Sequence, residues 1–398
     1  MPEPILAEPD VQFIRELIAD GGGGLKKCFQ CATCSAVCDM SDQAVSFPRK
    51  QMIMAQWGMR DELLKDAGVW VCHDCGDCTA HCPRDVNPAR IMSAIRQQAI
   101  RNFAFPAFMG ELAAKPATSI LILIPAALLA LLAMLPLQFT HQWSTIIPQP
   151  LLLLLLVAVT ALMLCIFAVE ITRFVRALRA GGAEGSILSA LGPTLNEIGG
   201  HGKAATARMV DFVIRRLNPK TGAQAQYITG CKEEKRRYLA HMLVMVLVLL
   251  PLVEIPLPVL HPLKLFINVC GLAGVTIFIV NRLRPEVRAK STPFDWSLLV
   301  LLESIFLTGL LFEVVRPLNL EPLMYGFYFA HFTFIFALLL YAPYSKLAHA
   351  LYRTVAMAAT WEKQQRLLHA ALVPEHSSES HTTCVSCGTP GKDGISYS

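Results

Sequence analysis

The sequence predicts a mostly α-helical protein in two parts, a cysteine-bearing helical domain fused to a bundle of six transmembrane helices. Of the 398 residues, 54% are apolar and only 16% are charged, whereas a soluble protein carries about 25% charged residues. Eight of the thirteen cysteines precede residue 83, and the long apolar stretches follow residue 117. These observations exclude a single soluble globule.

The first part of the chain, 1–105, is mixed in polarity and holds the eight cysteines. It opens without the basic start and apolar core of a signal peptide, so we expect it in the cytoplasm. Thiols are kept reduced there, which favours metal ligation over disulfides. The predicted division is a cytoplasmic domain at 1–105, a membrane domain at 106–373 with a basic connection at 173–237, and a flexible cytoplasmic tail at 374–398.

Six apolar stretches are long enough to cross the hydrocarbon core of a bilayer, which requires about 20 residues of helix. They are 118–137, 151–171, 238–259, 263–280, 294–315 and 323–344. Each should be helical, because only a helix satisfies its own backbone polar groups in lipid. Pro251, Pro256 and Pro258 predict that the third stretch kinks or ends early.

The distribution of Lys and Arg predicts the orientation, because cytoplasmic connections are enriched in both. The connections at 173–237 and 282–290 are basic, and those on the opposite side are nearly bare. We therefore expect a multi-pass protein of the cytoplasmic (inner) membrane with its N-terminal domain and its tail in the cytoplasm. The net charge of +5 then reflects topology and not nucleic-acid binding. Residues 204–217 read as a basic amphipathic helix at the membrane surface.

The N-terminal cysteines form two copies of the pattern C-x2-C-x2-C-x3-C, and Pro83 follows the second copy. In such a run three thiolates bind one cubane and the fourth thiolate binds the other. The pattern therefore assigns one [4Fe-4S] cluster to Cys28, Cys31, Cys34 and Cys82, and a second to Cys72, Cys75, Cys78 and Cys38. The first copy departs from the usual run because Asp39 stands where proline is expected.

Structural zinc is the alternative for these cysteines. Zinc sites normally use two separated C-x2-C pairs, and eight cysteines in two triplets exceed that need. Helices are predicted at 45–67, between the motifs, and at 87–102, after them. The domain therefore reads as an α-helical ferredoxin and not as a compact β-rich one.

Histidines in or at the ends of membrane helices are costly and mark functional sites. His331 and His349 are eighteen residues apart, which on a continuous helix places them on one face about 27 Å apart. That spacing suits axial ligation of two stacked b haems. We pair His349 with His241 for the inner haem. We pair His331 with His261 for the outer haem, with His141 as the fallback. The fold predicted for the whole chain is an α-helical ferredoxin domain fused to a six-helix transmembrane haem b bundle.

Other interpretations of these polar residues stay open. The histidines could instead cap helices or hold neighbouring helices together. Glu303, near the middle of the fifth stretch, is a candidate proton relay at a quinone site. Its alternative is a protonated acid that forms a hydrogen bond to the next helix.

The motifs resemble known redox proteins. The two cysteine runs resemble the iron–sulfur subunit of heterodisulfide reductases. The segment 236–241 and the pair His331 and His349 look like the di-haem b membrane subunits of heterodisulfide and nitrate reductases. Their fusion in this order is similar to the membrane subunits of quinone-interacting membrane-bound oxidoreductase complexes of dissimilatory sulfur metabolism. The resemblance covers nearly the whole chain except the first twenty residues and the tail.

The resemblance implies electron exchange between menaquinone and two soluble flavin and iron–sulfur partner subunits, which in turn serve adenylylsulfate reductase. We therefore expect a quinone-interacting oxidoreductase subunit with two [4Fe-4S] clusters and two b haems. The alternative is a membrane subunit of a heterodisulfide-reductase-like or sulfite-reduction complex with another soluble partner. Two further classes are an anchor without haem and a transporter with a regulatory iron–sulfur domain. The transporter class is disfavoured because the spans show no clear internal repeat.

Overall fold

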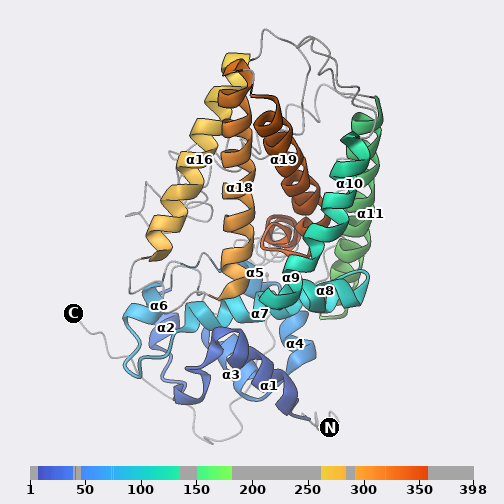
Figure 1. Cartoon of the computed structure of the whole chain (residues 1–398). Helices are drawn as coiled ribbons and strands as arrows, with labels where there is room; N and C mark the ends of the chain where they lie inside the picture. Colours follow the sequence, from blue (N-terminus) through green and yellow to red (C-terminus); the bar gives the residue numbers. More distant parts are fainter. Residues whose placement is uncertain are drawn as a thin grey trace, which may run out of the picture.

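The computed structural model describes residues 8–38, 41, 46–72, 74, 76–134, 150–181, 261–283, 292–318 and 320–356. Within these residues the chain forms helices and loops without a β-strand. Figure 1 shows short helices gathered at one end of the molecule and long helices standing above them. The mostly α-helical fold class is thereby confirmed for the described residues.

The short helices form the cysteine-bearing domain. They are α1 (Val11–Leu17), α2 (Thr33–Ala36), α3 (Arg49–Gln56), α4 (Arg60–Leu64), α5 (Gly68–Val71), α6 (Asp77–Ala80) and α7 (Pro88–Phe103). The longest, α7, starts where the Asn87 side chain accepts a hydrogen bond from Arg90 N, with Pro88 in the first turn. Its apolar face packs against buried Phe13, Met52 and other core residues. Most of the other short helices of the domain therefore pack around this helix.

The predicted helix at 87–102 is confirmed as α7. The helical prediction for 45–67 is confirmed in part, because the chain there forms two helices, α3 and α4, with a break between them. The break falls at Gly58, whose φ of 65° is in the left-handed region. A Cβ at Gly58 would lie 2.7 Å from Asp10 O, so close packing of the N-terminal segment requires glycine at this position.

Four helices are long and apolar enough to cross a membrane, within Leu151–Ala180, Lys264–Leu283, Phe294–Leu318 and Glu321–Ala356. They correspond to α11 (Pro150–Ala180), α16 (His261–Leu283), α18 (Pro293–Val315) and α19 (Glu321–Tyr341). The first predicted span appears as a shorter apolar helix, Ile120–Met134, which contains α10 (Leu123–Met134). Two more short helices, α8 (Ala107–Ala114) and α9 (Pro116–Ser119), lead into it from α7. The third predicted span, 238–259, lies outside the described residues, as do 204–217 and the tail.

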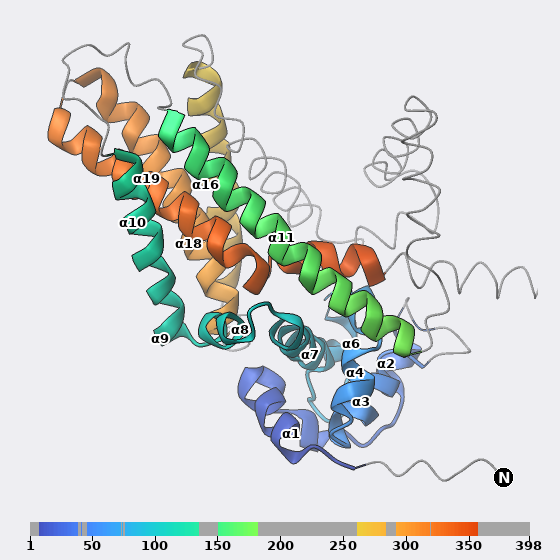
Figure 2. The same ribbon diagram turned by 90° about the vertical axis from the view of Figure 1, so that its right-hand side faces the viewer.

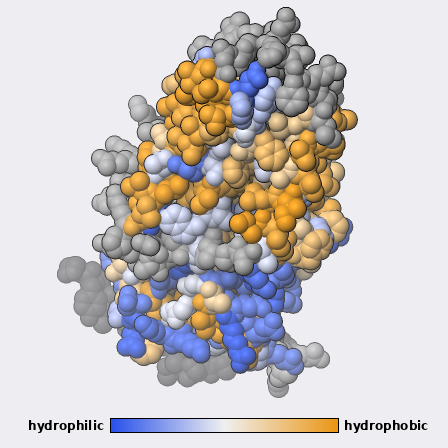
Figure 3. Space-filling view, in the orientation of Figure 1, coloured by the Kyte–Doolittle hydropathy of each residue, from blue (hydrophilic) through white to orange (hydrophobic). Residues whose placement is uncertain are grey.

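The long helices pack around α19, which contacts α10 and α18, while α16 lies against α18 (Figures 1 and 2). Buried Phe332 and Phe336 of α19 share a core with small residues of α10, including Ala126 and Ala130. Large apolar side chains face outward along these helices. Figure 3 shows hydrophobic residues over the long helices and hydrophilic residues over the cysteine-bearing domain. This distribution suits helices surrounded by lipid.

The last membrane helix does not run straight to His349. Helix α19 ends at Tyr341, a 3-10 turn follows at Ala342–Tyr344, and Ser345 is extended before the helical segment 348–356 begins. Figure 1 views this segment along its axis, whereas α19 runs across the view. The Ser345 hydroxyl accepts a hydrogen bond from Leu347 N at 3.1 Å and thereby starts the new segment.

The prediction of one continuous helical face carrying His331 and His349 is therefore wrong. The physical cause is the turn at Ala342–Tyr344, since Pro343 has no backbone N–H to donate to the preceding turn. His331 stays on α19, and His349 lies in a segment of different direction.

One buried carboxylate joins the two parts of the molecule. Asp295, in the first turn of α18, is only 2% exposed. Its Oδ2 accepts a hydrogen bond from Arg90 Nη1 of α7 at 2.8 Å and lies 3.5 Å from Arg282 Nη1 near the end of α16. Lys346, beyond α19, forms an ion pair with Oδ1. The same carboxylate caps its own helix by accepting from Thr292 N at 3.0 Å.

A second set of contacts holds the link that leaves α7. The backbone N–H of Phe105 donates to Glu170 of α11 at 3.1 Å, and its carbonyl accepts from the Tyr344 hydroxyl at 2.7 Å. One turn further along α11, Arg173 donates to Ala104 O at 3.1 Å. Because these backbone groups are paired by side chains of membrane helices, the link is fixed against the bundle.

We predict that Asp295→Asn destabilises the protein by about 3 kcal/mol or more, because it leaves three cations facing one another without a buried counter-charge. Denaturant titration of the purified chain in detergent measures the change. The matched control is Asp61→Asn, which removes an exposed pair with Lys65 at 3.8 Å and should cost no more than about 0.5 kcal/mol. Equal stabilities of the two variants would contradict this role of Asp295.

Candidate metal centre

The two cysteine motifs adopt the same backbone course. In the first, Gln30 and Ala32 have φ values of 60° and 67°. At the equivalent positions of the second, Asp74 and Gly76 have φ values of 58° and 90°. A one-turn helix follows each loop, α2 in the first motif and α6 in the second, and the two helices contact each other. The sequence repeat is therefore a structural repeat.

Residues in the left-handed region can turn backbone N–H groups toward one side of a loop, and such concave loops bind anions at many iron–sulfur sites. The Asp74 N–H donates to Cys72 Sγ at 3.4 Å within the second loop. A cubane held by four thiolates is anionic, so the shape of both loops suits such a cluster.

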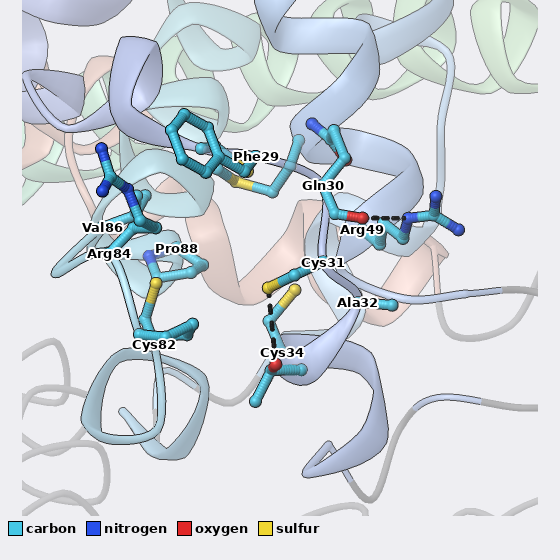
Figure 4. A pocket seen from close by; sticks show the side chains of 14 residues that line it. Phe29, Gln30, Cys31, Ala32, Cys34, Arg49, Cys82, Arg84, Val86 and Pro88 are labelled. Carbon is cyan, nitrogen blue, oxygen red and sulfur yellow. Dashed lines mark hydrogen bonds between the residues drawn. The ribbon is translucent and has the colours of Figure 1, made fainter.

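Four cysteines line one cavity, three from the first motif and one from the second. They are Cys28, Cys31, Cys34 and Cys82. Figure 4 shows Cys82 across the cavity from Cys31 and Cys34. These are the residues that the spacing assigns to one cluster, so the fold brings the assigned set together. The short helices α2 and α6 explain this grouping, because each loop returns its last cysteine toward the partner motif.

Apolar and basic side chains complete the walls of this cavity. Pro83, Val86 and Pro88 line it together with Arg49 and Arg84. Arg49 Nε donates to Gln30 O at 3.1 Å, and the Arg84 guanidinium stacks over the Phe29 ring at 4.0 Å. Two guanidinium groups beside an anionic group lower the free energy of placing its negative charge in the protein.

The remaining cysteines also crowd together, apart from Cys75, which lies outside the described residues. Burial raises the pKa of the Cys78 thiol to about 12, with added repulsion from Cys72, Cys38 and Cys34. Burial and the neighbouring Cys28 thiol likewise raise the pKa of Cys34. Thiols crowded in this way ionise readily only when a metal compensates their charge, so the donor set fits bound iron.

The two cysteine groups differ in their surroundings. Cys31 is exposed, and Phe29 beside it is 68% exposed, so the first group reaches solvent at Cys31. A hydrogen bond with Thr33 lowers the pKa of the exposed Cys31 thiol. The second group follows Trp70, which is buried against helices of the membrane domain. Exposure is thus shown for Cys31 of the first group, and contact with the membrane helices for the tryptophan that precedes Cys72 of the second group.

In the part of the chain that the structure describes, no three His, Cys, Asp or Glu side chains converge as ligands of a single metal ion. The four thiols of the first group surround a cavity instead. Ligands of a cubane are arranged in this way, since each thiolate binds a different iron.

His331 is held by the neighbouring helix. Its Nδ1 lies 3.0 Å from Ile305 O and 3.3 Å from Thr308 Oγ1, both on α18. The ring also fills the space beside Gly309, where a Cβ would lie 2.8 Å from His331 Cε1. A ligating histidine usually donates one ring N–H to a carbonyl and binds metal through the other nitrogen. The surroundings of His331 fit that role.

The other predicted haem ligands have different positions. His349 packs against Trp70, with ring centroids 5.9 Å apart. His261 is the first residue of α16. His241 and His141 lie outside the described residues, so both haem-ligand pairs stay predictions.

Glu303 accepts a hydrogen bond from Thr276 of α16 at 2.8 Å. This geometry matches the interpretation of an acid bonded to the next helix. Its Oε2 is buried and has no hydrogen-bond partner among the described residues. The proton-relay role stays a prediction.

Two residues with central positions are absent from the sequence-based candidates. No local sequence pattern predicts that Asp295 contacts cations distant in sequence. The sequence does signal a helix start there, because Thr292, Pro293 and Asp295 precede an apolar run. Trp70, two residues before Cys72, gives no signal that it contacts a helix at 348–356.

Comparisons with known proteins agree with this geometry. A family model for the 4Fe-4S dicluster domain matches residues 24–86, which contain both motifs. Residues 24–86 are thus similar in sequence to 4Fe-4S dicluster domains, which supports bound [4Fe-4S] clusters. No solved structure matches the chain.

Three related curated proteins are named as subunits of heterodisulfide reductases or as similar to one. Over 99 residues the chain is 32% identical to a subunit of the H(2):CoB-CoM heterodisulfide,ferredoxin reductase of Methanothermobacter thermautotrophicus, a match that covers 25% of this chain and 54% of that protein. Over 94 residues it is 36% identical to a protein of Archaeoglobus profundus that is named as similar to a heterodisulfide reductase subunit, covering 23% and 48%.

A third relative is named as an iron–sulfur subunit. Over 102 residues the chain is 30% identical to this subunit of the CoB--CoM heterodisulfide reductase of Methanopyrus kandleri, covering 26% of this chain and 45% of that protein. The chain spans about half the length of the three relatives. Each match is close in length to the cysteine-bearing domain.

We predict that Gly76→Ala destabilises the second loop by about 1 kcal/mol, because alanine is strained at a φ of 90°. An added Cβ there has open space, so the effect comes from the backbone alone. Ala32→Gly should stabilise the first loop by a similar amount. Thermal unfolding and iron content per chain are the measurements. The control is Gly23→Ala, which also has open space but a right-handed backbone. A Gly76→Ala variant as stable as Gly23→Ala would contradict the prediction.

Proposed function

We propose that this chain is a membrane electron-transfer subunit of an oxidoreductase complex. In this proposal two [4Fe-4S] clusters in the N-terminal domain exchange electrons with soluble partner subunits, and the membrane domain exchanges them with menaquinone through two b haems. The single observation that carries the proposal is the cavity lined by thiols of both motifs, in a domain fixed against long apolar helices.

The clusters are assigned as the cysteine spacing assigns them. Cys28, Cys31, Cys34 and Cys82 hold the cluster on the solvent side, and Cys72, Cys75, Cys78 and Cys38 hold the cluster on the membrane side. Support comes from the exposure of Cys31 and from the burial of Trp70 next to Cys72. A soluble partner then exchanges electrons at the first cluster, and the membrane domain does so at the second.

In the membrane domain, His349 and His241 are the proposed ligands of the inner haem. His331 and His261 are those of the outer haem, with His141 as the fallback. Support for His331 comes from the carbonyl of Ile305, which accepts from Nδ1 and leaves Nε2 for a metal. Haem, when bound, supplies one-electron chemistry between the clusters and the quinone pool.

Glu303 is the proposed proton relay for quinone, since its buried Oε2 is open to a further hydrogen bond.

The proposed partners are two soluble flavin and iron–sulfur subunits that serve adenylylsulfate reductase. This assignment rests on the order of the two fused parts. The alternative is a heterodisulfide-reductase-like or sulfite-reduction complex with another soluble partner. The relatives of this chain, which are named as parts of heterodisulfide reductases, are closer to the alternative but do not favour it over the first assignment. Identification of the proteins that co-purify with the chain distinguishes the two.

Cysteine substitutions test the cluster assignment. We predict that Cys82→Ser and Cys28→Ser abolish the same cluster signal in electron paramagnetic resonance, although the two residues belong to different motifs. Cys38→Ser and Cys72→Ser should each abolish the signal of the other cluster. Each variant should retain about half of the non-haem iron. The control is Cys165→Ser, on α11, which should retain both signals. If Cys28→Ser and Cys38→Ser lose the same cluster, the assignment is wrong.

Reduced-minus-oxidised visible spectra of the purified chain test the haem assignment. We expect b-type bands and about two haems per chain by pyridine haemochrome. His331→Ala and His349→Ala should each remove about one haem, because each removes an axial ligand. His81→Ala, in the cysteine-bearing domain, is the control and should keep both haems. Absence of b-type bands from the unsubstituted chain would favour an anchor without haem.

A further inference from the structure

A cluster of buried aromatic rings lies where the cysteine-bearing domain meets the membrane helices. Trp70 of α5 stacks on Tyr352 with ring centroids 5.0 Å apart, and its centroid is 5.9 Å from that of His349. Phe174 of α11 meets Trp70 edge-on at 5.7 Å. Phe103 of α7 completes the group through Phe174 and Tyr352. Trp70 is the member that comes from the cysteine motif and touches His349.

Trp70 is also fixed relative to Cys72, the first thiol of the membrane-side group. It is 1% exposed, so its ring has no freedom to leave the contact. Arg96 of α7 donates to Val69 O at 3.5 Å and to Cys72 O at 3.2 Å, and thereby clamps the backbone on both sides of Trp70. The short chain from Cys72 to the indole ring is therefore rigid.

We propose that Trp70 is the contact through which electrons cross between the membrane-side cluster and the redox group at His349. The inference rests on the proposed function, because it takes Cys72 as a cluster ligand and His349 as a haem ligand. It adds the residue that joins the two centres. Sequence spacing gives no sign of this contact.

The physical reason is the packing of the gap. Electron tunnelling falls steeply with distance and falls less steeply through packed protein atoms than through an empty or water-filled gap. The indole ring contacts His349 and is held in position by its stacking on Tyr352. With a cluster held by Cys72 and a haem held by His349, one electron would leave the reduced cluster and one would enter the oxidised haem. No bond would break, no proton would move and the indole ring would be left unchanged.

Flash photoreduction of the purified full chain tests this route. A photoexcited deazaflavin in solution reduces the exposed cluster, and the later reduction of haem is followed in the b-type bands. In Trp70→Leu we expect cluster reduction at the unsubstituted rate and haem reduction slowed by about tenfold or more, because the ring no longer bridges the gap. Trp70→Phe retains a smaller ring and should be slowed to an intermediate extent. This second variant also serves if Trp70→Leu fails to fold.

The matched control is Phe174→Leu. It removes a fully buried ring from the same aromatic group but leaves the contact between Trp70 and His349. Its haem reduction should stay within about twofold of the unsubstituted rate, and the cluster signals of all variants should be unchanged. Unslowed haem reduction in both Trp70 variants, or equal slowing by Phe174→Leu, would contradict the role of Trp70 and leave the proposed function standing. Absence of haem bands from the unsubstituted chain would overturn the proposed function and the route together.

Discussion

The arrangement of the molecule depends on one buried carboxylate, Asp295. It lies at the start of α18 and is met by Arg90 from the cysteine-bearing domain, by Arg282 from α16 and by Lys346 beyond α19. A buried charge of this kind is tolerated only where opposite charges surround it. The ion cluster therefore fixes the domain against the bundle, and with it the distance between the second cysteine motif and the membrane helices.

The docking of the cysteine-bearing domain on the membrane helices places the two cysteine groups in different surroundings. The first group reaches solvent at Cys31, while the group beside Trp70 faces the aromatic contact with the segment 348–356. Apolar side chains cover the outer faces of the long helices. A one-electron path from a soluble partner to a lipid-soluble carrier needs such an order, because each centre must lie close to the next. The turn after α19 contributes to this order by carrying His349 toward Trp70.

Much of this could be predicted from the sequence where the signal is local. The cysteine spacing assigned Cys82 to the cavity of Cys28, since ligation by cubanes imposes a repeated pattern. Hydropathy predicted the helices that became α11, α16, α18 and α19. The turn at Ala342–Tyr344 has a local signal in Pro343, but the apolar run continues through it and predicts an unbroken helix. The break at Gly58 was missed because it depends on packing against Asp10, which is distant in sequence. Asp295 was missed for the same reason.

We propose that electrons pass between the iron–sulfur clusters and a quinone in the membrane. The most direct test of this claim uses the purified chain in liposomes, reduced chemically and then freed of reductant. When menaquinone is present in the bilayer, the oxidised cluster spectrum should return on the time scale of a stopped-flow measurement. In liposomes without quinone the clusters should stay reduced. Clusters that stay reduced in the presence of menaquinone, with haem and iron contents intact, would contradict the claim.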